Sequence, residues 1–235
     1  MRQIFFITGT DTGVGKTVFT RLLAQFLRRR GVAVAALKPL CSGGRDDALA
    51  LHAALAGGLP LDEINPWHFR APLAPLLAAR RENKTVKLAQ VLAHIRARQK
   101  QFAVTLVEGA GGLLSPLGKH FDSRDLLAAL RATPVIVAPN KLGAVNHILL
   151  TLSALSPPPR ARAVVILFAP RKPDAATATN AGLLGQFLPR ARIFNLPWLG
   201  DEFEPEKALK DARVRKTLAA LTKAWNLPSI AKTHA

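Results

Sequence analysis

A glycine-rich segment near the start of the chain has the residue types needed to hold a nucleotide phosphate. Residues 4–20 read IFFITGTDTGVGKTVFT, and five residues separate Gly9 from Gly15. Backbone N–H groups of such a loop, and of a helix that follows it, can face the β- and γ-phosphates. Lys16 adds a positive charge, and the Thr17 hydroxyl can ligate Mg²⁺. The segment therefore predicts nucleotide binding.

This interpretation depends on the structure on either side of the loop. Residues 4–7 are apolar and β-branched or aromatic, which is typical of a strand buried on both faces. From Lys16 to Leu27, apolar residues recur at helical spacing, and Gly13 adds freedom to the loop. A chance GKT tripeptide would lack this strand, loop and helix order. The order favours phosphate binding although the usual pattern has one loop residue fewer.

Two carboxylates and a second lysine are expected near the same phosphates. Glu108 follows the apolar run 104–107, where a buried acid is costly without a partner, and Asp47 follows the loop after Lys38. Mg²⁺ takes one or two carboxylates from a protein, so Thr17, Asp47 and Glu108 are candidate metal ligands. The alternatives are a helix cap for Asp47 and solvated charges for Glu108 and Lys38.

The rest of the chain alternates strands with helices. Further strands are predicted over 32–37, 104–107, 134–138, 164–168 and 193–196. Further helices are predicted over 48–56, 75–82, 86–100, 144–154, 175–188 and 206–225, with 57–75 as a connector. This alternation predicts an α/β fold: a doubly wound, mostly parallel sheet with helices on both faces, of the P-loop NTPase type. Residues 1–235 are expected to form a single domain, with about ten frayed residues at the C-terminus.

Composition limits the remaining classes of function. The formal charge is +18, from 33 Lys and Arg against 15 Asp and Glu, and such a charge attracts anions, nucleic acid included. However, many cations fall at predicted helix ends, where they complement the helix dipole, as Arg28 to Arg30 do. No nucleic-acid motif with interleaved aromatics is present, and the chain has no Tyr. These features disfavour a nucleic-acid partner.

The cysteine count and the hydropathy pattern bear on location. Cys41 is the only cysteine, which excludes an internal disulfide framework and a cysteine-rich zinc site. There is no uncharged apolar run long enough for a membrane span, and the chain enters a strand at once instead of a signal peptide. We therefore expect a soluble, cytoplasmic protein.

Several motifs occur in a fixed order along the chain, and together they resemble one family. They are Thr8 to Thr17, Lys38-Pro39 with Ser42-Gly43, Asp47 to Leu51, Asn65-Pro66 with Phe69, Val107 to Gly112, Lys141 to Gly143 with Asn146-His147, and Pro197 to Leu199. The set resembles dethiobiotin synthetase, the ATP-dependent ligase that closes the ureido ring in biotin biosynthesis. The matches cover most of residues 3–155. The loop alone is shared by related ATPases, whereas the ordered set is specific.

The resemblance implies a reaction in which 7,8-diaminononanoate, CO₂ and ATP give dethiobiotin, ADP and phosphate through a carbamate and its mixed anhydride with phosphate. It implies Mg²⁺ on Thr17, Asp47 and Glu108, and a homodimer with sites at the interface. The catalytic residues implied are Lys16, Lys38, Thr12 and Ser42. Those for ATP are Asp11, Thr12, Gly13, Val14, Gly15, Lys16, Thr17, Val18, Glu108, Gly109 and Gly111. Those for the diamine substrate are Thr12, Lys38, Ser42, Gly111 and, from the second subunit, Gly143, Ala144 and Asn146.

The chain departs from the family pattern at three places. Gly13 stands where the family often has an acid, and Ala74-Pro75-Leu76 replaces a Ser-Pro-His. Phe168-Ala169 replaces an Asn-Asp pair whose Asn contacts adenine in the family. We therefore expect a looser preference for the nucleotide base.

Two other classes of function remain open on the sequence. One is a related P-loop protein, either an amidoligase acting on another acid or a partner-regulated ATPase. Such regulators commonly carry a second lysine early in the loop, and residues 8–12 contain none. The other is a non-catalytic nucleotide or nucleic-acid binder, against which the retention of Lys16, Lys38 and the three metal candidates argues.

Overall fold

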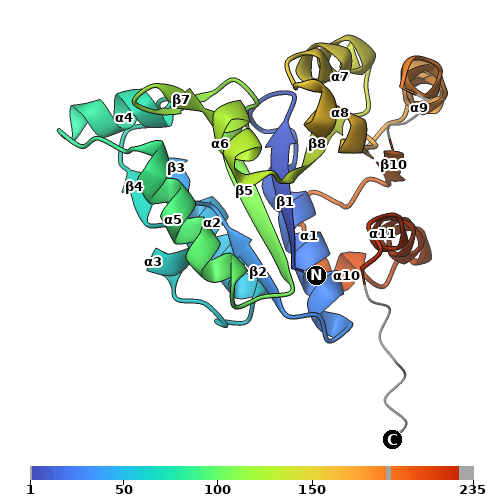
Figure 1. Cartoon of the computed structure of the whole chain (residues 1–235). Coiled ribbons are helices and arrows are strands. Elements are labelled where there is room, and N and C mark those ends of the chain that lie inside the picture. The colour runs from blue at the N-terminus through green and yellow to red at the C-terminus, as the bar shows by residue number, and fades with distance from the viewer. Residues whose placement is uncertain (1, 189–191, 228–235) are drawn as a thin grey trace, which may run out of the picture.

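A six-stranded parallel sheet forms the centre of the molecule. We describe a computed structural model, which covers residues 2–188 and 192–227. The strand order in the main sheet is β10-β9-β8-β1-β5-β2, and every neighbouring pair is parallel (Figure 1). Its strands are β1 (Gln3–Gly9), β2 (Val34–Leu37), β5 (Val104–Gly112), β8 (Thr133–Pro139), β9 (Val164–Phe168) and β10 (Arg192–Leu196). The predicted parallel sheet is confirmed.

Two short strand pairs stand outside the main sheet. A parallel pair joins β3 (Leu40–Ser42) to β4 (Trp67–Phe69), and an antiparallel hairpin joins β6 (Pro116–Gly118) to β7 (Phe121–Asp122). Both follow strands of the main sheet, after β2 and β5 respectively. They therefore extend the structure beyond the edge where ligands collect in parallel α/β sheets.

Helices cover both faces of the sheet. They are α1 (Lys16–Arg29), α2 (Asp46–Ala54), α3 (Leu61–Ile64), α4 (Pro75–Arg81), α5 (Leu88–Gln99), α6 (Ser123–Leu130), α7 (Ala144–Ser153), α8 (Pro157–Arg162), α9 (Ala175–Phe187), α10 (Pro205–Ala208) and α11 (Ala212–Ala224). α1 packs with α2 and α10, whereas α5 packs with α6, and both groups contact β5. Right-handed crossovers place the two groups on opposite faces.

The hydrophobic core explains why β1 lies in the middle. Phe5, Phe6 and Ile7 are almost completely buried, as a central strand covered on both faces requires. β1 pairs with β5 on one side and β8 on the other, and β5 also pairs with β2. The carboxyl ends of β1, β2 and β5 therefore meet at one edge, although long stretches of sequence separate them.

The predicted strands and long helices are confirmed, with small shifts at their ends. One strand boundary was wrong in a way that matters for the site: β5 runs to Gly112 rather than ending at Val107. Its glycine-rich end stays in the sheet because it pairs with β1, Gly112 lying opposite Gly9 after a shift in register. Glu108 is therefore a buried residue within a strand, not one that follows it.

The prediction of a connector over 57–75 was wrong in part. Residues 61–64 form α3 and residues 67–69 form β4. β4 exists because Trp67 and Phe69 pair with Leu40 and Ser42, a contact between distant residues that no local pattern shows. The single helix predicted over 206–225 is two helices, because the Asp211 carboxylate accepts the Arg213 N–H and starts α11 afresh.

Besides α3, two more helices were not predicted. α6 starts with a capping box: Asp122 accepts the Asp125 N–H at 2.9 Å, and Asp125 accepts the Asp122 N–H at 3.0 Å. α8 begins with a run of prolines, which are tolerated in the first turn of a helix but do not signal one. The predicted frayed C-terminus falls mainly on residues 228–235, which lie outside the described residues.

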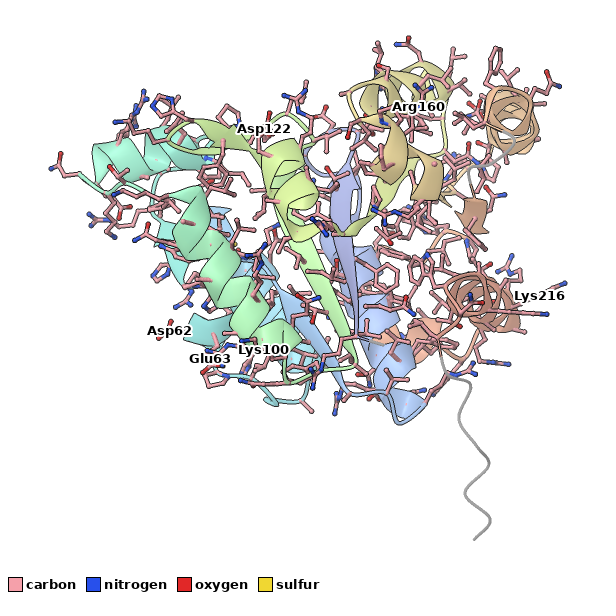
Figure 2. All side chains as sticks on the ribbon, in the orientation of Figure 1. Asp62, Glu63, Lys100, Asp122, Arg160 and Lys216 are labelled. Carbon is pink, nitrogen blue, oxygen red and sulfur yellow. The ribbon has the colours of Figure 1, made fainter. Side chains whose placement is uncertain are left out.

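The surface carries the positive charge, and the described helices include none that is long and apolar enough to cross a membrane. Figure 2 shows Lys100, Arg160 and Lys216 on the outside of the molecule, pointing away from the sheet. The last turns of α1, α4 and α5 each contain two arginines, as helix dipoles favour. Six of the 33 Lys and Arg residues thus have a structural role at helix ends.

The packing of α1 on the sheet gives a test of the core. Leu22 of α1 is fully buried, so Leu22→Ala should lower the free energy of unfolding by about 2–5 kcal/mol. The matched change Leu49→Ala on α2 removes a side chain that is 49% exposed and should cost within about 0.5 kcal/mol. Urea denaturation followed by circular dichroism measures both. Equal losses would contradict the packing described.

Candidate active site

A cavity of about 770 Å³ opens at the carboxyl edge of the sheet. This volume lies in the range of small-molecule and cofactor sites. Its wall comes from the glycine loop and the start of α1, the segment from β2 to α2, the residues before α4, and the end of β5. The lining residues include Thr12, Gly13, Gly15, Lys16, Thr17, Val18, Lys38, Cys41, Ser42, Asp47, Leu73, Ala74, Pro75, Gly111 and Ser115. Segments far apart in sequence thus form one site.

The glycine loop has the backbone conformation that phosphate binding needs. Gly15 has φ of 97° and precedes the first turn of α1, a left-handed conformation that favours glycine. A Cβ atom at this position would lie 3.2 Å from the ring of Phe168, so the ring lies against the loop. Since the start of α1 carries unpaired N–H groups at the positive end of its dipole, the cavity presents a site for an anion.

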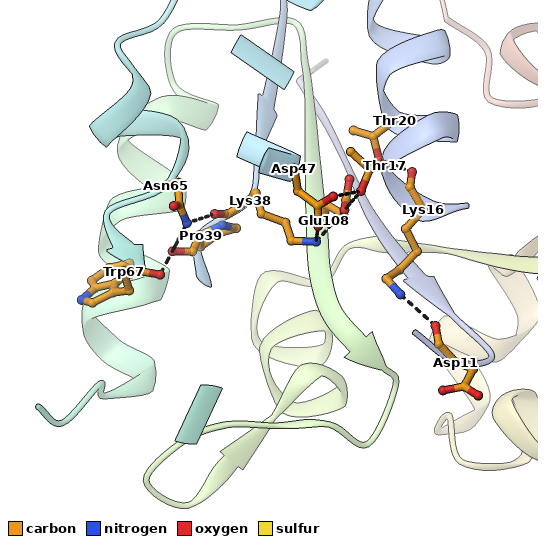
Figure 3. Close-up of polar contacts among 10 residues, drawn as sticks. All are labelled: Asp11, Lys16, Thr17, Thr20, Lys38, Pro39, Asp47, Asn65, Trp67 and Glu108. Carbon is orange, nitrogen blue, oxygen red and sulfur yellow. Dashed lines mark hydrogen bonds and ion pairs between the residues drawn. The ribbon is translucent and has the colours of Figure 1, made fainter. Parts of the chain in front are cut away.

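Lys16 is held at the edge of this loop. Its Nζ donates to the Asp11 carbonyl oxygen at 2.8 Å, and its own carbonyl accepts the Thr20 hydroxyl at 2.9 Å (Figure 3). Burial, together with the nearby positive charge of Lys38, lowers the pKa of Lys16 to about 8. An anion in the cavity would favour the charged form of Lys16, so the residue suits a phosphate ligand.

An ion cluster lies beside the loop, in which Lys38 and Glu108 are buried and Asp47 is half-exposed. Lys38 Nζ is 2.6 Å from Glu108 Oε1 and 2.8 Å from Asp47 Oδ2. Thr17 Oγ1 lies 2.7 Å from Glu108 Oε1 and 2.9 Å from Asp47 Oδ1, and its one proton can go to only one of them at a time. Figure 3 shows these four side chains converging from the residue after β2, from α2, from β5 and from α1. The predicted metal candidates and the second lysine therefore meet.

The charges in this cluster fix one another's protonation. Burial by itself would lower the pKa of Lys38, but Glu108 and Asp47 outweigh it and raise that pKa above the usual range. Burial would raise the pKa of Asp47, but Lys38 and the Thr17 hydroxyl outweigh it and lower that pKa. Lys38 is therefore a cation at physiological pH although its side chain is only 5% exposed.

The same residues fit a magnesium ion. Glu108 Oε2 is buried and has no hydrogen-bond partner, so a second carboxylate oxygen is available at the cluster. Among the described residues, no three His, Cys, Asp or Glu side chains come together as a metal site. Two carboxylates and a hydroxyl are hard oxygen donors of the kind that Mg²⁺ takes from proteins alongside phosphate oxygens and water. Glu108 lies behind Lys38 and does not line the cavity.

Asn65 positions Lys38 and was assigned no site role from sequence. Its buried side-chain amide donates to the Lys38 carbonyl oxygen at 2.7 Å, and the Lys38 N–H donates to the Ile64 carbonyl oxygen at 3.0 Å. These contacts fix the backbone at the end of β2 from a segment that looked like a connector. The sequence signal that could have indicated this role is a polar residue, Asn65, between the apolar Ile64 and Pro66.

Ser42 and Thr12, for which substrate contacts are predicted, both lie on the cavity wall. Ser42 Oγ donates to the Leu73 carbonyl oxygen at 2.5 Å, so its proton is already committed. Near Thr12, Gly111 has φ of 69°, and a Cβ there would clash with the Ser115 side chain. Ser115 was not predicted from sequence, because only the turn after Gly111 returns it to the cavity.

The other predicted residues occupy different positions. Val18 and Gly13 line the cavity, whereas Asp11 and Val14 belong to the loop without lining it. Gly109 packs against Phe6 inside the sheet, since a Cβ there would lie 3.1 Å from the ring. Cys41 lines the cavity, and its burial raises the pKa of its thiol to about 11.

The three residues predicted to contact substrate from a second subunit lie elsewhere. Gly143 caps the start of α7 with φ of 86°, and Ala144 and Asn146 are in its first turn. None of the three lines the cavity of its own chain. They would meet a substrate only in another molecule's cavity.

Comparison with known proteins identifies the family to which these features belong. A family profile described as an AAA domain matches residues 3–205. The ATP-dependent dethiobiotin synthetase BioD of Anaeromyxobacter dehalogenans (strain 2CP-C) is 39% identical over 92% of this chain and 96% of its own length. The enzymes of that name from Akkermansia muciniphila and Methanocaldococcus jannaschii are 40% and 38% identical, over 64% and 65% of this chain and 71% and 73% of theirs.

A solved structure supports the fold alone. The pNOB8 ParA protein bound to nonspecific DNA superposes with a TM-score of 0.57, covering 95% of this chain and 97% of its own, at 14% identity. At that identity the likeness extends to the arrangement of strands and helices and not to the ligand. The identity to the first relative along nearly the whole length of both chains shows that this chain belongs to the dethiobiotin synthetase family.

Proposed function

We propose that this chain is a dethiobiotin synthetase, which uses ATP and CO₂ to close the ureido ring on 7,8-diaminononanoate. The observation that carries the proposal is the convergence of Lys16, Thr17, Lys38, Asp47 and Glu108 beside one cavity. Relatives that carry this name match the chain over most of its length. The product would be dethiobiotin, with ADP and phosphate released.

The reaction divides into three steps with balanced charge and atoms. One substrate amine adds to CO₂ and loses a proton, giving a carbamate. A carbamate oxygen attacks the γ-phosphorus and ADP leaves, giving the mixed anhydride. The second amine then attacks the carbonyl carbon and loses a proton, and phosphate leaves as the ring closes. Phosphoryl transfer depends chiefly on positioning and on neutralising negative charge, and the two lysines of the site can supply both.

Each lysine has its own place in this scheme. Lys16, at the loop, would bind the β- and γ-phosphates, and their negative charge would stabilise its protonated form. Lys38, on the opposite side of the Asp47 and Glu108 pair, would neutralise the carbamate and the transferring phosphoryl group. Mg²⁺, held by Thr17, Asp47 and Glu108, would supply charge neutralisation on the phosphate oxygens.

Ser42 would act as a hydrogen-bond acceptor. Because its hydroxyl proton goes to the Leu73 carbonyl, only its oxygen lone pairs face the cavity. It would therefore accept an N–H from a substrate amine rather than donate to the carbamate. The hydroxyl of Thr12, on the loop side of the cavity, makes no such bond within the part of the chain that the structure describes, and it would serve the substrate or a phosphate.

The proposal includes a homodimer in which the start of α7 reaches the partner's cavity. Leu142 is 83% exposed and Leu150 is 60% exposed, so apolar surface lies at both ends of α7. Asn146 is also exposed and stands one turn before Leu150. A second copy of the chain would bury this surface and bring Gly143 and Ala144 to a substrate carboxylate, for which a helix start is suited.

Three further expectations from the sequence remain predictions. They are the single-domain organisation of residues 1–235, a cytoplasmic location and the lack of a nucleic-acid partner. The first agrees with the continuous main sheet, in which β1 lies between strands from both halves of the chain.

The reaction itself gives the first test of the proposal. The purified protein is mixed with ATP, Mg²⁺, bicarbonate and the diamine, and ADP release is followed together with the mass of the organic product. We expect ADP only when the diamine is present, and a product of dethiobiotin mass. Lys16→Ala should lower turnover by about 10² or more, since a charge on the transferring phosphate is lost. EDTA should stop the reaction.

The control is Lys216→Ala, which removes an exposed lysine of α11 and should leave turnover unchanged. Hydrolysis of ATP that is independent of the diamine, or ADP release without the expected product, would contradict the proposal.

The base preference gives a second test. Phe168 ends β9, its ring lies against Gly15, and it offers no hydrogen bond to a base. One missing hydrogen bond is worth about tenfold, so we expect kcat/KM for GTP and CTP within about tenfold of that for ATP. Phe168→Asn should restore a preference for ATP, whereas Phe187→Asn on the exposed face of α9 should not. An ATP preference already strong in the wild type would refute this expectation.

The dimer gives a third test. Leu150→Glu places a charge on the proposed interface and should convert the dimer to a monomer in light-scattering chromatography, with a raised KM for the diamine. Leu49→Glu changes a comparably exposed leucine on α2 and should leave the dimer intact. A wild-type monomer with full turnover would exclude the shared site.

A further inference from the structure

The side chains assigned to the metal are already bonded to a cation of the protein. Lys38 Nζ lies 2.6 Å from Glu108 Oε1 and 2.8 Å from Asp47 Oδ2. In the described part of the chain, Lys38 is the only ion-pair partner of either carboxylate. The Glu108 side chain is fully buried and that of Lys38 is 5% exposed. The lysine therefore occupies the carboxylates from within the protein.

The net charge of the site explains how a metal ion would be received. Lys16 and Lys38 carry two positive charges, and Asp47 and Glu108 carry two negative ones, so the set is neutral. A divalent cation alone would leave two uncompensated charges in a largely buried site, which is costly. A nucleoside triphosphate brings about four negative charges. Together with a divalent cation it adds about two net negative charges, which the two lysines can neutralise.

The structure also shows which part of Lys38 is free to move. Two hydrogen bonds hold its backbone. The Lys38 carbonyl oxygen accepts from the Asn65 side-chain amide, and the Lys38 N–H donates to the Ile64 carbonyl oxygen. Its side chain lines the cavity, and its ammonium group is carried on a flexible four-carbon stem. A change in the position of the ammonium group therefore needs only rotation about side-chain bonds and no movement of β2.

We propose that Lys38 is a resident substitute for the metal, which makes binding of the divalent cation conditional on the nucleotide. Without nucleotide, Lys38 neutralises Asp47 and Glu108 and keeps free cations out. When phosphates enter the cavity, the Lys38 ammonium leaves the carboxylates for the incoming anion and frees their oxygens, including the unpaired Glu108 Oε2. This inference rests on the metal ligands of the proposed function and adds the order of binding.

Binding of Mn²⁺ as a paramagnetic probe tests the inference without turnover. Free Mn²⁺ is measured by electron paramagnetic resonance on the full chain, with no nucleotide and with a non-hydrolysable ATP analogue. The wild type should bind Mn²⁺ weakly alone and far more tightly with the analogue. Lys38→Met should bind nucleotide-free Mn²⁺ at least about tenfold more tightly, since one nearby positive charge is gone. Lys216→Met, with the same loss of charge at an exposed site, should match the wild type.

A measurement on the wild type guards against misfolding of the variant. With ¹⁵N-labelled lysine, the Nζ signal of Lys38 should resist exchange in the free protein, stay in place with Mg²⁺ alone, and move when Mg²⁺ and the analogue are added together. Nucleotide-free Mn²⁺ affinity that is equal in wild type and folded Lys38→Met, or a Lys38 signal that moves with Mg²⁺ alone, would overturn the inference. Either result can occur in a protein that still makes dethiobiotin, so the two proposals fail separately.

Discussion

The ion cluster of Lys38, Asp47 and Glu108 is the interaction on which the rest of the site depends. Lys38 and Glu108 are buried, so removing either one leaves the other uncompensated, at a cost of about 3–5 kcal/mol, whereas the Asp47 side chain is 47% exposed and partly screened by solvent. The three side chains come from the residue after β2, from α2 and from β5, and Thr17 of α1 bonds to the same carboxylates. The order of strands in the sheet is what allows this, because β5 lies between β1 and β2. The topology of the sheet thus determines which charged residues lie together.

Local patterns were enough to predict the frame and the loop. Buried parallel strands are continuous apolar runs, and the helices carry apolar residues with 3.6-residue periodicity. The glycine loop lies between the first strand and the first helix, β1 and α1. They were not enough where structure comes from contacts between distant residues. β4 forms only by pairing with β3, and β5 continues through its glycines only because β1 lies beside it. α6 had a local signal in Asp122 and Asp125, but the helix is short and its capping box was not recognised.

In the candidate site, too, local patterns indicate the residue types, whereas the contacts between them depend on the fold. The residue types at positions 16, 17, 47 and 108 indicate phosphate and metal chemistry from the sequence alone. That Lys38 would bond to both carboxylates, and that the Ser42 proton would go to Leu73, follows only from three-dimensional distances. The likeness to a DNA-bound ParA protein reflects a shared arrangement of elements. Six of the 33 Lys and Arg residues are arginines in the last turns of α1, α4 and α5, where they complement helix dipoles.

A crystal structure with Mg²⁺, a non-hydrolysable ATP analogue and 7,8-diaminononanoate would test the account most directly. We expect the metal on oxygens of Thr17, Asp47 and Glu108, the Lys38 ammonium on the γ-phosphate side of the cavity, and the substrate carboxylate at the start of the partner's α7. Lys38 still bonded to both carboxylates with nucleotide present, or the diamine bound away from this cavity, would contradict it.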